Sequence, residues 1–86
     1  MNLDLYTSAF CDPSIITRAV IADVQRVVPA VNVRELDVAR EELLAREAGI
    51  RSTPTIVVRS DAGDEVFRAE GIPTINQVLV ALAKAV

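Results

Sequence analysis

The chain has 86 residues, of which 51% are hydrophobic, and it carries a formal net charge of −3 with one cysteine and no histidine. A single cysteine excludes an internal disulfide, and the lack of histidine excludes the usual zinc clusters, so we expect no metal site. The arginines and lysine form no basic stripe and only three side chains are aromatic, so we do not expect nucleic-acid binding.

The length fits one domain that spans residues 1–86. No apolar tract is long enough to cross a bilayer, and the first ten residues contain neither a basic leader nor a long apolar segment. We therefore expect a soluble, cytoplasmic protein that does not bind membranes.

Residues 3–29 predict a strand followed by a helix. Apolar Leu3 and Leu5 alternate with polar Asp4, which is typical of a strand, and we expect this strand to span residues 3–7. Helical spacing begins at Pro13, and Pro29 ends it. The side chains of this helix that we expect to face the core are Ile16, Val20, Val24 and Val27.

Residues 31–48 predict a second strand and a second helix. Valines and a leucine over residues 31–36 indicate the strand. Asp37 can cap the helix that follows, and Gly49 with Ile50 fits its C-terminal end. The side chains expected to face inward are Leu43, Leu44 and Ala48.

The last third of the chain predicts a hairpin and a third helix. Residues 55–58 are apolar or β-branched on both faces, as in a central strand, and the turn SDAGD joins them to residues 65–69. Thr74 and Gln77 form a capping box. The predicted apolar stripe consists of Ile75, Val78, Leu79, Leu82 and Val86. The order βαβαββα predicts an α/β fold, with a four-stranded mixed sheet and three helices on its two faces.

The chain resembles the thioredoxin superfamily, in its short form, over essentially its whole length, and three stretches carry the resemblance. LYTSAFCDPS (5–14) is similar to the strand-to-helix active-site segment of thioredoxins and glutaredoxins. AGIRSTPTIVV (48–58) resembles the segment that carries their cis-proline, and EVFRAEGIPTINQVLVAL (65–82) resembles their last strand, glycine turn and final helix. The resemblance implies a thioredoxin-like fold.

Cys11 stands at the predicted junction between the first strand and the first helix. Unpaired backbone N–H groups and the helix dipole lower the pKa of a thiol at this place, which makes Cys11 a candidate nucleophile. Pro13 suits the first helical turn, where a missing N–H costs nothing. Asp12 is expected to weaken the shift, because a nearby carboxylate disfavours the thiolate. The alternative reading of Cys11 is an inert, buried small side chain.

Ser14 stands where the C-x-x-C site of the family has its second, resolving cysteine. A mixed disulfide on Cys11 must therefore be resolved by a thiol from outside the chain, and Ser14 is left to donate a hydrogen bond to the thiolate. Leu5 replaces the buried acid that thioredoxins place six residues before the first cysteine, which removes the proton acceptor for the same step. Both departures favour a natural monothiol site. An engineered cysteine-to-serine change that traps the mixed disulfide remains the other explanation.

The resemblance also implies substrate-binding roles for Thr53, Pro54 and Gly71. The Thr53-Pro54 bond would be cis and lie beside Cys11, which leaves the Thr53 backbone free to pair with an extended substrate strand. An ordinary trans proline before a strand is the alternative. Gly71 would close the substrate groove, or would act as a simple turn glycine.

We expect no resident cofactor, and glutathione is a candidate co-substrate. Arg18 and Arg51 could meet a glutathione carboxylate, but solvated arginines on the surface need no such role. Monothiol glutaredoxins with a C-G-F-S site bind a bridging iron–sulfur cluster. The CDPS site departs from that pattern at both middle positions, so a cluster is not expected.

The sequence thus predicts a thiol–disulfide oxidoreductase of the thioredoxin or glutaredoxin type that works by a monothiol route through Cys11. Its expected partners are a protein or glutathione disulfide as substrate and an external thiol that resolves the mixed disulfide. The leading alternative is a non-catalytic thioredoxin-like module that binds an extended peptide in the same groove. A thiol titration separates the two hypotheses.

Overall fold

The computed structural model describes residues 1–86, which form four strands and three helices. The strands are β1 (Asn2–Thr7), β2 (Asn32–Asp37), β3 (Thr55–Arg59) and β4 (Glu65–Glu70), and the helices are α1 (Asp12–Val27), α2 (Glu42–Glu47) and α3 (Ile75–Lys84). The order βαβαββα is therefore confirmed. None of the three helices combines the length and the apolar character that crossing a membrane requires.

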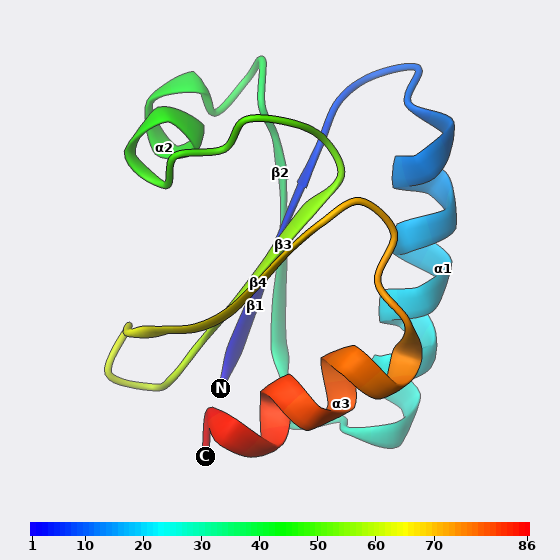
Figure 1. Cartoon of the computed structure of the whole chain (residues 1–86), viewed down its shortest axis with the longest axis vertical. Helices are drawn as coiled ribbons and strands as arrows, with labels where there is room; N and C mark the ends of the chain where they lie inside the picture. The colour runs from blue at the N-terminus through cyan, green and yellow to red at the C-terminus, as the bar shows by residue number, and fades with distance from the viewer.

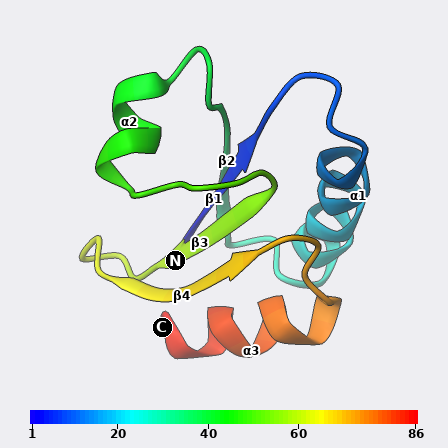
Figure 2. The same ribbon diagram turned by 45° about the horizontal axis from the view of Figure 1, so that its top comes forward.

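The strands form one mixed sheet in the order β2-β1-β3-β4 (Figure 1). β1 and β2 are parallel, as a strand, crossover helix and second strand require, whereas β3 runs antiparallel to both β1 and β4. Helices α1 and α3 lie on one face of the sheet and α2 lies on the other (Figure 2). The four-stranded mixed sheet with helices on two faces is confirmed.

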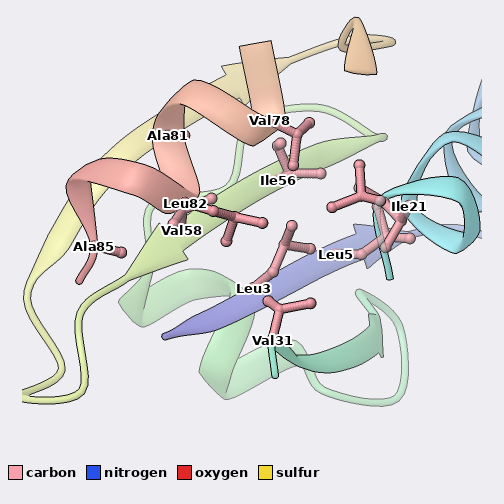
Figure 3. Close-up of a cluster of buried hydrophobic side chains, with 11 residues drawn as sticks. Leu3, Leu5, Ile21, Val31, Ile56, Val58, Val78, Ala81, Leu82 and Ala85 are labelled. Carbon is pink, nitrogen blue, oxygen red and sulfur yellow. The ribbon is translucent and has the colours of Figure 1, made fainter. Parts of the chain in front are cut away.

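The main core lies between the sheet and helices α1 and α3 (Figure 3). Because side chains alternate along a strand, Leu3 and Leu5 of β1 point into this core, and Ile56 and Val58 of β3 do the same. Its other buried members are Ile21, Val24, Val31, Val78, Ala81, Leu82 and Ala85. A smaller cluster beneath α2 contains Tyr6, Leu36, Ala45 and Val57. β3 is therefore buried on both faces, as its apolar sequence predicted.

The buried face of α1 differs from the predicted one. Ser14, Thr17, Ile21 and Val24 are buried, whereas Ile16 and Val27 are 52% and 65% exposed. Thr17 tolerates burial because its hydroxyl donates a hydrogen bond of 2.8 Å to the Pro13 carbonyl. Apolar residues surround much of this helix, so their spacing alone does not determine which side faces the sheet.

Helix α2 begins later than predicted, and Asp37 does not cap it. Asp37 ends β2, and its carboxylate accepts hydrogen bonds from the backbone N–H groups of Ala39 and Arg40 at 2.8 and 3.1 Å. It therefore caps the turn that precedes the helix. As a result the inward side chain is Ala45, and the predicted Leu43 and Leu44 are exposed.

The C-terminal end of α2 agrees with the prediction. Gly49 adopts a φ of +70°, the Ile50 N–H donates to the Ala45 carbonyl at 3.0 Å, and the Gly49 N–H donates to the Arg46 carbonyl at 3.1 Å. This is the Schellman arrangement, in which a glycine in the left-handed region closes the last helical turn.

The capping box of α3 is present. The Gln77 N–H donates to the Thr74 hydroxyl at 3.1 Å, and the Thr74 N–H donates to the Gln77 side chain at 2.9 Å. Two members of the predicted stripe, Ile75 and Val86, are exposed. The residues of this region that contact the main core most closely are Val78, Ala81, Leu82 and Ala85. The helix therefore contacts the sheet through Val78, Ala81 and Leu82.

Candidate functional site

Cys11 lies between β1 and α1 and is the N-cap residue of the helix. Its backbone is extended, with φ −102° and ψ 101°, and its carbonyl accepts a hydrogen bond of 3.0 Å from the Ser14 N–H. Pro13 lies in the first turn of α1, where the missing N–H breaks no helical hydrogen bond. The thiol is partly exposed, so a solute can reach its sulfur.

Two hydroxyl side chains connect Cys11 to the segment before β3. Thr53 donates a hydrogen bond from its Oγ1 to the Cys11 Sγ, and the thiol in turn donates to the Thr53 carbonyl. Each of these two distances is 3.7 Å. Ser8 lies 2.8 Å from the Thr53 Oγ1. The sulfur is therefore positioned by residues from the end of β1 and from the start of β3.

Ser14 is fully buried behind Cys11, and its Oγ has no hydrogen-bond partner in the resting geometry. A hydroxyl can rotate toward an acceptor, and a thiolate is a far better acceptor than a neutral thiol. The Ser14 hydroxyl is accordingly the largest effect that lowers the pKa of Cys11. An ionised Cys11 would offer an acceptor to this otherwise unpartnered hydroxyl.

The pKa of Cys11 is lowered from its ordinary value by several further donors. After the Ser14 hydroxyl, the lowering effects come from the Ser14 backbone N–H, the Thr53 hydroxyl and the Ser8 hydroxyl. Desolvation of the sulfur acts in the opposite direction. The opposing effect is therefore desolvation, and the exposed Asp12 carboxylate, from which we expected it, is not among these groups.

The Thr53-Pro54 peptide bond is cis, and Thr53 lies beside Cys11 as the resemblance implied. The Pro54 carbonyl accepts a hydrogen bond of 2.8 Å from the Gly71 N–H, which places Gly71 next to this loop. Gly71 has a φ of +87°, a conformation that favours glycine, although no atom lies within 4 Å of the position of a Cβ. Backbone conformation therefore accounts for this glycine.

Two residues near the thiol were not found from the sequence. Phe10 directly precedes Cys11, has a φ of +60° and is fully exposed. A left-handed conformation is unfavourable for a residue with a Cβ, by roughly 1–2 kcal/mol, and such residues gather at functional sites. Ser8 carries no sequence signal of its own. Phe10 could have been noticed as an aromatic side chain in a polar loop beside the cysteine.

Arg18 and Arg51 form no hydrogen bond to the sulfur, and each binds a carboxylate. Of the two, only Arg18 also interacts electrostatically with Cys11. The Arg18 Nε lies 2.8 Å from the Glu35 Oε1, and the Arg51 Nη2 lies 2.6 Å from the Glu70 Oε1. These hydrogen bonds raise the pKa of both guanidinium groups. The two arginines serve first as partners of surface carboxylates.

No carboxylate lies behind the thiol. Leu5 is buried in the main core, whereas the neighbouring Asp4 points to the opposite face of the sheet and pairs with Arg34 and Arg59. No group of three or more histidine, cysteine, aspartate or glutamate side chains is arranged to hold a metal ion. The chemistry available at this site is that of one thiol and its surrounding hydroxyls.

No family model and no curated protein matches the sequence. Solved structures do match: thioredoxin-2 of the malaria parasite has a TM-score of 0.88 at 17% identity, covering 96% of this chain and 81% of that one. Mitochondrial thioredoxin 3 of Saccharomyces cerevisiae has a TM-score of 0.85 at 17% identity, covering 96% and 76%. Thioredoxin 1 of Thermosipho africanus has a TM-score of 0.83 at 13% identity, covering 98% and 92%. The chain has the thioredoxin fold.

Within this thioredoxin fold the candidate residues gather at one end of the sheet. Cys11 and Ser14 follow the carboxyl end of β1, and Thr53 and Pro54 precede β3, which runs antiparallel to β1. The two segments therefore meet at the same end of the sheet. The position is the end of the thioredoxin fold at which α1 begins (Figure 1).

Proposed function

We propose that this chain carries out thiol–disulfide exchange through Cys11 by a monothiol route. The observation that carries the proposal is the set of hydroxyl and N–H donors around a partly exposed sulfur, led by the otherwise unpartnered Ser14 hydroxyl. These donors favour the thiolate, which is the attacking species in disulfide exchange. An inert cysteine in the interior needs none of them.

The exchange takes place in two steps, each of which forms one S–S bond and breaks another. The Cys11 thiolate attacks one sulfur of a disulfide, forms a new S–S bond to it and releases the other sulfur as a thiolate. Because the chain has no second cysteine, an external thiolate then attacks the mixed disulfide at the substrate sulfur. This second attack frees the Cys11 thiolate and leaves the substrate joined to the external thiol.

The segment before β3 is suited to hold an extended substrate. Thr53 makes no backbone-to-backbone hydrogen bond, so its N–H is free to pair with a substrate strand. Its carbonyl accepts only from the Cys11 thiol, and it loses that donor when Cys11 ionises. A hollow of about 250 Å³ borders Thr53 and is lined also by Val38, Ile50, Arg51 and Ser52. We assign Thr53 and Pro54 to substrate binding, with Gly71 supporting the loop through its hydrogen bond to Pro54.

The partners follow from the same chemistry. The substrate is a protein disulfide or glutathione disulfide, and glutathione or a partner thiol resolves the mixed disulfide without any resident cofactor. A site that depends on a reduced thiol fits a reducing compartment such as the cytoplasm.

A second candidate function is a thioredoxin-like module that binds an extended peptide without chemistry. The fully exposed Phe10 beside Cys11 favours it, because an exposed aromatic ring suits contact with a partner. The two functions use the same surface and differ only in whether the sulfur reacts.

Replacing Ser14 by cysteine tests the proposal. The fully buried Ser14 follows Cys11 by three residues in the first helical turn, so the new thiol will lie close to Cys11. The natural protein should accumulate a mixed disulfide with glutathione that only added thiol removes. Ser14→Cys should form an internal disulfide, shorten the life of the mixed disulfide and reduce insulin with excess dithiol. Mass spectrometry and insulin turbidity measure these outcomes.

Ser60→Cys is the matched control, because it also adds one thiol but lies at the far end of β3 from Cys11. Cys11→Ala serves as the blank. If Cys11 forms no mixed disulfide in the natural protein, or if the bridged Ser14→Cys variant reduces no insulin, the peptide-binding function is the better one. Reduction by Ser60→Cys at the same rate would also contradict the proposal.

A further inference from the structure

A hollow of about 370 Å³ lies on the sheet face that α2 covers only in part. The short α2 packs over Tyr6, Leu36 and Val57, toward one end of the sheet, and Figure 1 shows it away from the N-terminus of β1. The hollow is lined by Asn2, Asp4, Asn32, Val33, Arg34 and Arg59. Its size lies at the lower end of the range for small-molecule sites, roughly 300–1,000 Å³.

A buried carboxylate lies at the base of this hollow, between two arginines. The Asp4 side chain is only 5% exposed. Arg34 binds it with two parallel hydrogen bonds, from Nε at 3.1 Å and from Nη2 at 2.9 Å. The Arg59 Nε approaches the same carboxylate at 3.5 Å. Two arginines therefore share one buried carboxylate. The charges of Glu41 and Glu65 also act on Arg34 and Arg59, but neither carboxylate forms an ion pair with them.

This arrangement differs from every other ion pair of an arginine in the chain. Elsewhere each paired arginine has a carboxylate of its own, in the pairs Arg18–Glu35, Arg26–Asp23, Arg46–Glu42, Arg51–Glu70 and Arg68–Glu65. A buried ion pair adds little stability compared with well-packed apolar side chains. The second arginine at Asp4 is therefore not explained by a contribution to stability.

Both arginines keep N–H donors for a ligand. Arg34 is 57% exposed and its Nη1 has no partner, while Arg59 donates from Nη1 only to the Gly63 carbonyl, at 3.5 Å, and leaves Nη2 free. Guanidinium groups bind planar pairs of oxygens on phosphate and carboxylate groups with good geometry. The site thus offers an anion both positive charge and donors, over a base fixed by Asp4.

We propose that this hollow binds a small oxyanion of the phosphate type between Arg34 and Arg59. The anion is either free phosphate or the phosphate group of a small ester. The site lies at the amino end of β1, whereas Cys11 follows its carboxyl end, so it is separate from the exchange site. Asp4 positions the arginines and at the same time limits the affinity by repelling the anion.

Titration of inorganic phosphate into ¹⁵N-labelled protein at low ionic strength tests the site by NMR. We expect saturable shifts of the Arg34 and Arg59 side-chain signals and of backbone amides in residues 2–4 and 32–34. A parallel titration with adenosine monophosphate separates the two sources of the anion. Tighter binding of the nucleotide indicates a phosphate ester, and equal or weaker binding indicates free phosphate. Absence of saturable shifts with both probes would overturn the proposal.

Two variants should change the affinity in opposite directions. Arg59→Gln removes charge and donors and should weaken phosphate binding about ten-fold, the loss expected for a hydrogen bond to a charged group. Asp4→Asn removes the repelling charge and should tighten binding severalfold. Arg46→Gln, which removes an exposed arginine of an ordinary ion pair on α2, is the control and should bind as the natural protein does.

Circular dichroism checks that each variant is folded. If Asp4→Asn fails to fold, Arg59→Lys replaces it, because lysine keeps the charge but loses the fork of donors and should bind more tightly than Arg59→Gln. Equal affinity of Arg59→Gln and Arg46→Gln would show nonspecific association with the surface and would overturn the proposal.

Discussion

Single hydroxyl groups lower the pKa of Cys11 in this chain. Ser14, Thr53 and Ser8 lie around the sulfur in place of a second cysteine and a buried acid, and all three act to lower the pKa of Cys11. Their combined effect is opposed by desolvation of the sulfur. The pKa of a thiol can thus be lowered by hydroxyl and backbone N–H donors, without a second cysteine or a buried acid beside it.

Ser14→Ala should raise the pKa of Cys11, because it removes the largest of the lowering effects. The rate of alkylation by iodoacetamide follows the thiolate, so its midpoint should move up in pH toward the free-cysteine value of about 8.5. At neutral pH the variant should react more slowly than the natural protein. Ser60→Ala, remote from the sulfur, is the control. An unchanged midpoint in Ser14→Ala would show that the other donors, and not the Ser14 hydroxyl, lower the pKa.

Much of the candidate site could be located from the sequence, since Cys11, Ser14, Thr53 and Pro54 lie in two recognisable stretches. The role of Ser8 could not, because its hydroxyl meets Thr53 only when residues 45 positions apart are brought together. Asp12 was expected to act on the thiolate from its adjacent position. Proximity in sequence did not predict an effect on the pKa of Cys11, because the exposed Asp12 is not among the groups that shift it.

The helices show which local signals determine an element. The capping box and the glycine end of α2 were predicted correctly, because each depends on a few neighbouring backbone groups. The buried face of α1 was predicted wrongly, because Ile15, Ile16 and Val27 make the exposed side of this helix apolar as well. Attachment to β1 through Cys11 places Ser14 and Thr17 against the sheet, and no periodicity of apolar residues shows this.

Thr74→Ala should destabilise the protein by about 0.5–2 kcal/mol, because the Gln77 N–H loses its acceptor at the start of α3. Urea unfolding followed by circular dichroism measures the change. Thr74→Ser keeps the hydroxyl and is the matched control, which should lose much less. Equal losses in both variants would mean that packing of the threonine methyl group, and not the cap, provides the stability.

At the scale of the whole molecule, ion pairs make the stability depend on pH. The pKa of Glu70 is lowered chiefly by its hydrogen bond from Arg51, and that of Glu65 chiefly by its hydrogen bonds from Arg68. A carboxyl with a lowered pKa binds fewer protons when folded than when unfolded. Its contribution to stability is therefore present above the unfolded-state pKa, about 4.3, and is lost as pH falls through the lower, folded-state value.

The urea midpoint should accordingly decrease as the pH is lowered below about 4.3. Glu70→Gln should be less stable at neutral pH and should show a weaker dependence on pH, because one of the two groups no longer titrates. Glu47→Gln, which removes an exposed glutamate outside every ion pair, should keep the full dependence. Both groups are partly exposed, so salt should reduce the effect. A midpoint that rises as the pH falls would contradict the assignment.

The single cysteine has a consequence for how the protein responds to its redox surroundings. When a protein with two cysteines closes an internal disulfide, it consumes one glutathione disulfide and releases two glutathione molecules. Its oxidation therefore depends on the total concentration of glutathione as well as on the ratio of reduced glutathione to glutathione disulfide. Cys11 has no internal partner, and under the proposed monothiol route its reaction with glutathione disulfide releases a single glutathione. The fraction of Cys11 in the mixed disulfide therefore follows the simple ratio of the two glutathione forms, and diluting both forms equally leaves that fraction unchanged.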